Sequence, residues 1–136
     1  MFRNPPDAVI RAILWTPRRI AVVGCSPEAS RDSHRIAALL MSRGHTVVPV
    51  NPAATAILGQ PCFPSLAAVP PPVEMVDIFR RADQAGAVVD EAIAAGARIV
   101  WMQLGVIDEA AATRAAAAGL TVVMDRCPAI EYRRLG

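Results

Sequence analysis

Short apolar segments alternate along this chain with segments of helical periodicity. The apolar segments lack a strict polar alternation, which is typical of strands buried on both faces of a parallel sheet. The predicted strands are 20–24, 45–50, 73–79, 98–102 and 120–124. The helices predicted between them are 33–43, 85–95 and 108–118. This order predicts repeated strand–helix units.

Three of these helices end at a glycine that directly precedes the next strand. Gly44, Gly96 and Gly119 lie where a left-handed residue commonly closes a helix. Repeated helix–glycine–strand junctions favour an α/β fold with a parallel sheet. We therefore expect a Rossmann-like, doubly wound parallel sheet of five strands with helices on both faces. The expected strand order is 3-2-1-4-5, which puts the switch point between the first and fourth strands.

Two further helices are expected outside this repeat. Residues 7–15 have apolar positions at helical spacing and are followed by Pro17, and residues 128–135 begin with a proline. We expect one domain over 1–136, with 1–17 as a helical extension that serves as a packing element or a dimer contact. A homodimer is left open. The middle segment, 53–72, is rich in proline and turn residues, with a brief extended piece at 62–63.

Composition narrows the class of protein. Apolar residues make up 54% and charged residues 19%, which is typical of a folded domain, and a net charge of +2 is too small to indicate nucleic acid binding. Cys25, Cys62 and Cys127 have no close spacing, so neither a disulfide framework nor a zinc site is expected. No apolar run approaches the roughly 20 residues that span a bilayer. We expect a cytoplasmic, reduced protein without a membrane partner.

The candidate site lies where the predicted strands end. Gly24, Asn51, Arg80 and Gln103 each follow a strand, and ligands of open α/β sheets bind at this edge. In the first turn, 24–27, small residues let the backbone approach an anion at the N-terminus of the next helix. Basic residues flank the start of that helix at Arg31 and Arg35. The pattern favours a nucleotide or another phosphate ester.

Two common phosphate-binding fingerprints are absent. A dinucleotide site has G-x-G-x-x-G and an acid after the second strand, whereas here only Gly24 is in place and the second strand ends in Val50-Asn51-Pro52. A Walker motif needs a lysine, and the chain contains none. These departures argue against NAD and against a P-loop nucleotide site.

Five segments, in order, resemble the small stand-alone CoA-binding proteins, whose domain is similar to the CoA-binding domain of the succinyl-CoA ligase alpha subunit. The segments are 22–27, 48–52, 76–81, 101–105 and 119–128. The resemblance implies that coenzyme A is the ligand and lies across the carboxyl ends of the strands. The implied contact residues are Gly24, Cys25, Ser26, Pro27, Arg35, Asn51, Pro52, Phe79, Arg80, Gln103, Leu104 and Gly105.

The resemblance also implies which part of CoA each turn would contact. The first turn would hold the diphosphate, Asn51 and Pro52 the adenosine, Phe79 and Arg80 the adenine and a phosphate, and 103–105 the pantetheine. Cys25 is left with two interpretations, contact with the CoA thiol or a small residue that fits the turn. Trp101 is either core or pocket wall.

The expected function is binding of CoA or an acyl-CoA without catalysis, because His34 and His45 lie in no recognisable nucleophile arrangement. One alternative is a non-catalytic CoA-binding subunit of an acyl-CoA ligase-type enzyme. Another is an adenine-nucleotide or redox sensor. Asp125, Arg126 and Glu131 are expected to form an internal ion pair that orders the C-terminal tail, with a role in the site as the alternative.

Overall fold

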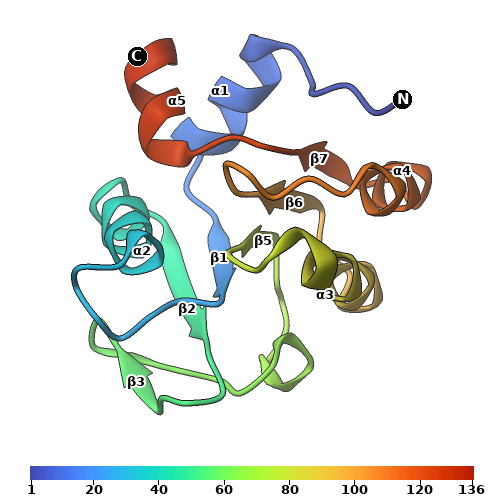
Figure 1. The fold of residues 1–136 in the computed structure, drawn as a ribbon. Helices are drawn as coiled ribbons and strands as arrows, with labels where there is room; N and C mark the ends of the chain where they lie inside the picture. The colour runs from blue at the N-terminus through green and yellow to red at the C-terminus, as the bar shows by residue number, and fades with distance from the viewer.

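Five parallel strands lie between two layers of helices in the computed structural model, which describes all 136 residues (Figure 1). The strands of this sheet are β1 (Arg19–Val23), β2 (Thr46–Val50), β5 (Met75–Ile78), β6 (Ile99–Met102) and β7 (Thr121–Val123). The helices are α1 (Asp7–Trp15), α2 (Asp32–Ser42), α3 (Ala82–Ala94), α4 (Glu109–Ala117) and α5 (Pro128–Leu135). A two-stranded hairpin of β3 (Ala56–Ile57) and β4 (Gln60–Pro61) and a 3-10 turn, η1 (Leu66–Ala68), occupy the middle segment.

Each central strand is apolar throughout because both faces of the sheet are covered. Along β1, Ile20 and Val22 face a core shared with α1, α2 and α5, while Ala21 and Val23 face a core shared with α3 and α4. Figure 1 shows the same division, with α3 and α4 on one side of the sheet and the other helices opposite. The predicted fold class, Rossmann-like with helices on both faces, is confirmed.

The predicted strand order is wrong in one respect. The order is β2-β1-β5-β6-β7, so the third predicted strand lies beside the first and not beside the second. In terms of the predicted strands this is 2-1-3-4-5 instead of 3-2-1-4-5, and the switch point lies between β1 and β5. Pro49 explains the difference, because a proline has no N–H to donate and is confined to edge strands. On its outer side, β2 pairs with no strand of the sheet and forms only an isolated β-bridge between Val50 and Phe63.

Polar contacts, some buried and some exposed, hold helix α5 against α1, and the two helices lie side by side in Figure 1. The Leu14 carbonyl, in the last turn of α1, accepts hydrogen bonds from Tyr132 Oη at 2.7 Å and from His45 Nε2 at 3.0 Å. Arg134 of α5 donates to both carboxylate oxygens of Asp7, at 2.9 and 2.8 Å. These contacts pack α1 against α5 within the chain.

The turn after β1 is packed tightly against the turn after β5. Gly24 has a φ of +87°, and a Cβ built there would lie 2.1 Å from the Phe79 carbonyl oxygen. The Gly24 N–H donates to the Val50 carbonyl at 2.9 Å, and the Phe79 N–H donates to the Val23 carbonyl at 2.8 Å. Glycine is therefore required at this position both for its conformation and for the lack of a side chain.

Replacing Gly24 by alanine tests this packing. Gly24→Ala should lower the free energy of unfolding by about 3 kcal/mol or more, because backbone strain adds to a steric clash. Gly44→Ala is the matched control, since Gly44 has a φ of +93° and nothing within 4 Å of its Cβ position. Gly44→Ala should lower the free energy of unfolding only by the cost of backbone strain, about 1–2 kcal/mol. Urea denaturation measures both, and equal losses would contradict the close contact.

Candidate functional site

A groove crosses the carboxyl ends of β1, β5 and β6 and runs between α2 and α5. Its volume of about 1160 Å³ is slightly above the range of roughly 300–1,000 Å³ for small-molecule sites. The lining residues are Gly24, Ser26, Ser30, Arg31, Asp32, Ser33, Arg35, Ile36, Leu39, Phe79, Arg80, Arg81, Gln103, Leu104, Val106, Cys127, Ala129, Ile130 and Arg133. Nearby turns of the sheet and two helices thus converge on one hollow.

The groove brings together only part of the residue set expected from the sequence. The expected residues that line it are Gly24, Ser26, Arg35, Phe79, Arg80, Gln103 and Leu104. The expected residues outside its lining are Cys25, Pro27, Asn51, Pro52 and Gly105. The difference follows from the strand order, because β2 is an edge strand and its end lies to one side of the groove.

Asn51 connects two turns instead of lining the groove. Its Nδ2 donates to the Cys25 carbonyl at 2.9 Å, and its Oδ1 accepts from the Ala53 N–H at 2.8 Å. Both ends of the side chain are therefore used within the protein. Asn51 holds the end of β2 against the first turn and so positions the backbone of that turn.

The first turn is bound to the beginning of α2. The Ser26 N–H donates to Ser33 Oγ at 2.9 Å, and His34 Nδ1 donates to the Ser26 carbonyl at 3.0 Å. No side chain caps α2, so the N–H groups of Asp32 and Ser33, which line the groove, are left without an acceptor in the protein. Free N–H groups and the helix dipole make this end of the groove suitable for an anion.

Positive charge is concentrated in the groove. Its lining includes five arginines and a single carboxylate, Asp32. Asp32 is paired with Arg35, and Arg81 lies 3.3 Å from Asp83. Arg80 and Arg133 have no hydrogen-bond or ion-pair partner among the side chains or backbone of the protein. The groove thus presents two unpaired guanidinium groups, from the end of β5 and from α5.

Two buried polar side chains next to the groove are incompletely satisfied. Gln103 lines the groove with 8% of its surface exposed, and its Oε1 has no hydrogen-bond partner. Asp77, in β5 between Val22 of β1 and Trp101 of β6, is fully buried, and neither carboxylate oxygen has a partner. Burial raises the pKa of Asp77 to about 8, so its carboxyl group is protonated at neutral pH.

The three cysteines differ in their access to the groove. Cys25 is fully buried, and burial, with smaller effects of Cys62 and Asp77, raises the pKa of its thiol to about 11. This supports the interpretation that Cys25 is a small residue that fits the turn. Cys62 Sγ donates to the Asn51 carbonyl at 3.5 Å, outside the groove. Cys127 lines the groove directly.

Sequence reasoning missed the part of the groove that α5 supplies, which includes Cys127, Ile130 and Arg133. A signal was present, because Pro128 marks the first turn of a helix that directly follows the last strand. The start of that helix must then lie at the same carboxyl edge as the other turns. Trp101 is fully buried core, and its Nε1 donates to the Arg126 carbonyl at 2.8 Å.

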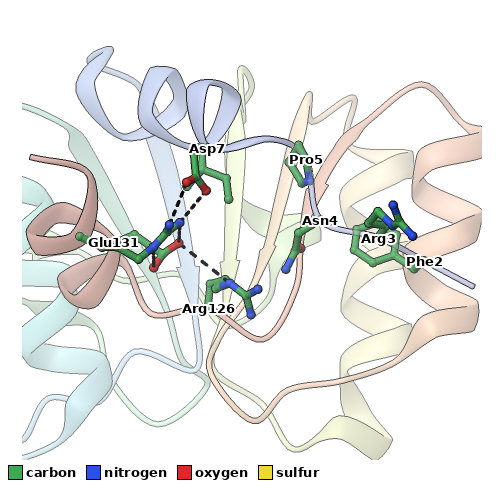
Figure 2. A pocket seen from close by; sticks show the side chains of 9 residues that line it. Phe2, Arg3, Asn4, Pro5, Asp7, Arg126 and Glu131 are labelled. Atoms are coloured by element: carbon green, nitrogen blue, oxygen red, sulfur yellow. Dashed lines mark hydrogen bonds and ion pairs between the residues drawn. The ribbon is translucent and has the colours of Figure 1, made fainter.

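A second hollow lies beside α1 and α5, and Figure 2 shows the residues around it. Buried Glu131 accepts from Arg134 at 2.8 Å and lies 4.0 Å from Arg126. The ion pair expected in the tail therefore forms between Arg126 and Glu131, whereas Asp125 accepts from the Gly105 N–H instead. Asn4 donates to the Met124 carbonyl at 2.9 Å and accepts from the Met124 N–H at 2.8 Å. These contacts order α5 and cover the edge of β7.

Neither a metal centre nor a membrane span is found. No group of three or more His, Cys, Asp or Glu side chains is placed to hold a metal ion. None of the helices combines the length and the apolar character needed to cross a bilayer.

Comparison with known proteins gives consistent matches. The model of the family described as CoA binding domain matches residues 18–133. Protein YneT of Bacillus subtilis is 36% identical over 125 residues, 92% of this chain and 93% of YneT. A solved structure from Pyrococcus horikoshii has a TM-score of 0.91 at 36% identity, over 99% of this chain and 97% of that one. An ADP-forming acetate–CoA ligase of Archaeoglobus fulgidus is 37% identical over 65 residues, 48% of this chain but 10% of the ligase.

The buried carboxyl group of Asp77 predicts a specific pH dependence. The native state keeps this proton up to about pH 8, whereas the unfolded chain releases it near pH 4, so the wild type should lose stability as the pH rises through this window. Asp77→Asn removes that titration. Relative to the wild type, its free energy of unfolding should rise by about 1 kcal/mol per pH unit between pH 5 and pH 7.

Urea denaturation at several pH values measures this difference. Asp83→Asn is the control for removal of a surface carboxylate, because the Asp83 side chain is 72% exposed. Parallel pH profiles for Asp77→Asn and the wild type would contradict a protonated Asp77.

Proposed function

The chain belongs to the CoA binding domain family, and on that premise we propose that it binds coenzyme A in the groove between α2 and α5. The observation that carries the proposal is the charge of this groove. Five arginines and one aspartate line it, whereas the whole chain has a net charge of only +2. CoA carries a diphosphate and a 3′-phosphate, and guanidinium groups are well suited to bind phosphate oxygens.

The proposal assigns the diphosphate to the beginning of α2. The unpartnered N–H groups of Asp32 and Ser33 are free to donate to phosphate oxygens, and Arg31 lies beside them in the lining of the groove. The remaining phosphate is assigned to Arg80 or Arg133, which have no partner within the protein. Phe79 also lines the groove and is available to stack on adenine.

The pantetheine arm is assigned to the turn after β6 and the start of α5. Leu104 and Ile130 are both large apolar residues with exposed side chains, at 56% and 41%, and both line the groove. An extended arm with methyl groups and amides would cover this apolar surface. Gln103 also lines the groove, and its buried, unpartnered Oε1 becomes an acceptor for an amide N–H of the arm when the side chain turns toward the groove.

The match to the Archaeoglobus ligase favours a second candidate function. In that case the chain supplies the CoA-binding part of a ligase-type enzyme and works with a partner chain, because the similarity covers only 10% of the ligase. Both candidates use the same groove for CoA.

Isothermal titration calorimetry tests the proposed ligand. CoA should bind more tightly than NAD or ATP by a factor of at least about ten, or about 1.4 kcal/mol. Dephospho-CoA, which lacks the 3′-phosphate, should bind more weakly than CoA. Binding of NAD or ATP without binding of CoA would contradict the proposal.

Arg80→Ala tests the contribution of the unpaired cation. Loss of one charge-assisted contact to a phosphate should weaken CoA binding by about tenfold or more. Arg98→Ala is the control, because Arg98 also has no ion pair, but it is exposed and precedes β6 at the opposite edge of the sheet. Calorimetry compares the two variants, and equal affinities would exclude Arg80 from the site.

A further inference from the structure

The groove contains one nucleophilic side chain to which the function proposed so far assigns no role. Of the three cysteines, Cys127 alone lines the groove, at the junction between β7 and α5. Cys25 is fully buried beneath the first turn, and Cys62 packs against the end of β2. Only Cys127 is therefore open to a ligand in the groove.

Cys127 is held in a defined position. The carbonyl of the preceding residue, Arg126, accepts from Trp101 Nε1 at 2.8 Å, and the Cys127 carbonyl accepts from the Glu131 N–H at 3.0 Å as the first bond of α5. The Gly105 N–H donates to Asp125 Oδ1 at 2.7 Å, which ties the turn after β6 to the same segment. The thiol thus lies on an ordered support beside the turn that carries Gln103 and Leu104.

The surroundings of Cys127 suit the thiol end of CoA better than its phosphates. Ala129 and Ile130 follow it on α5 and line the groove, as do Leu104 and Val106 of the turn that the Gly105–Asp125 hydrogen bond ties to this segment. Positive charge in the same groove comes from the arginines near the start of α2 and after β5, and from Arg133 farther along α5. A ligand with phosphates at one end and an apolar arm ending in sulfur matches this division.

Gln103 is an independent indication that a ligand with hydrogen-bonding groups occupies this end. It lines the groove with more than nine-tenths of its surface buried, and its Oε1 has no partner in the protein. A buried amide oxygen without a donor costs about 1–3 kcal/mol. The pantetheine arm carries amide N–H groups a short distance from its thiol and would satisfy this acceptor.

We infer that Cys127 forms a mixed disulfide with CoA by thiol–disulfide exchange with CoA disulfide, and this inference rests on the proposed binding of CoA. The Cys127 thiolate attacks one sulfur of the CoA disulfide, whose S–S bond breaks as the Cys127–CoA bond forms. The second CoA leaves as a thiolate and takes up the proton that Cys127 gave up. One disulfide is replaced by another, so no further oxidant is needed.

Intact-protein mass spectrometry of the reduced protein incubated with CoA disulfide tests this step. We expect the mass of one CoA moiety to be added, one equivalent of CoA thiol to be released, and peptide mapping to place the adduct on Cys127. Dithiothreitol should remove it. Acetyl-CoA, which fills the groove without a free thiol, should slow the reaction.

Oxidised glutathione controls for simple thiol reactivity. It lacks the nucleotide, so it should modify Cys127 more slowly than CoA disulfide by at least about tenfold, since binding raises the effective concentration of the disulfide at the thiol. Cys62→Ser should react like the wild type. Cys127→Ser should lose the adduct and still bind CoA in calorimetry, because serine is well tolerated at the N-cap position that Cys127 occupies.

The outcomes separate this inference from the proposed function. CoA binding without an adduct, an adduct on Cys25 or Cys62, or equal rates with glutathione disulfide would overturn the role of Cys127 and leave CoA binding intact. Failure of the wild type to bind CoA would overturn both.

Discussion

The close contact between Gly24 and the Phe79 carbonyl is the constraint on which the site depends. It exists because β1 and β5 are neighbours in the sheet, so the turns that follow them meet at the switch point. After these turns, helix α2 packs on one face of the sheet and helix α3 packs on the opposite face. The groove opens at this divergence, as in other doubly wound sheets, and Arg80 enters it directly beside the first turn.

Local structure could be predicted well from the sequence. The first and last helices have the expected bounds, Asp7–Trp15 and Pro128–Leu135, because prolines mark their limits. Asp108 caps α4 as expected, accepting from the Ala111 N–H at 3.0 Å. The order of the strands depends on which segments pair across the chain, and apolar periodicity carries no such information. Pro49 is the local sign in the sequence that β2 is an edge strand.

The same limit explains why part of the expected site lies outside the groove. Treating all strand ends as equivalent placed Asn51 and Pro52 with the other turns, whereas an edge strand ends beside the groove and Asn51 is used to hold Cys25. Attention to the first turn favoured Cys25 as the thiol of interest. The structure buries Cys25 and brings Cys127, more than a hundred residues later, into the groove, because α5 packs on α1 and α2.

A crystal structure of the protein grown with CoA would test the central claim most directly. The account predicts electron density for the diphosphate at the N-terminus of α2, for a phosphate near Arg80 or Arg133, and for the pantetheine arm between Gln103 and the start of α5. Density for CoA in the hollow beside α1, around Arg3 and Arg126, with the groove between α2 and α5 unoccupied, would contradict it.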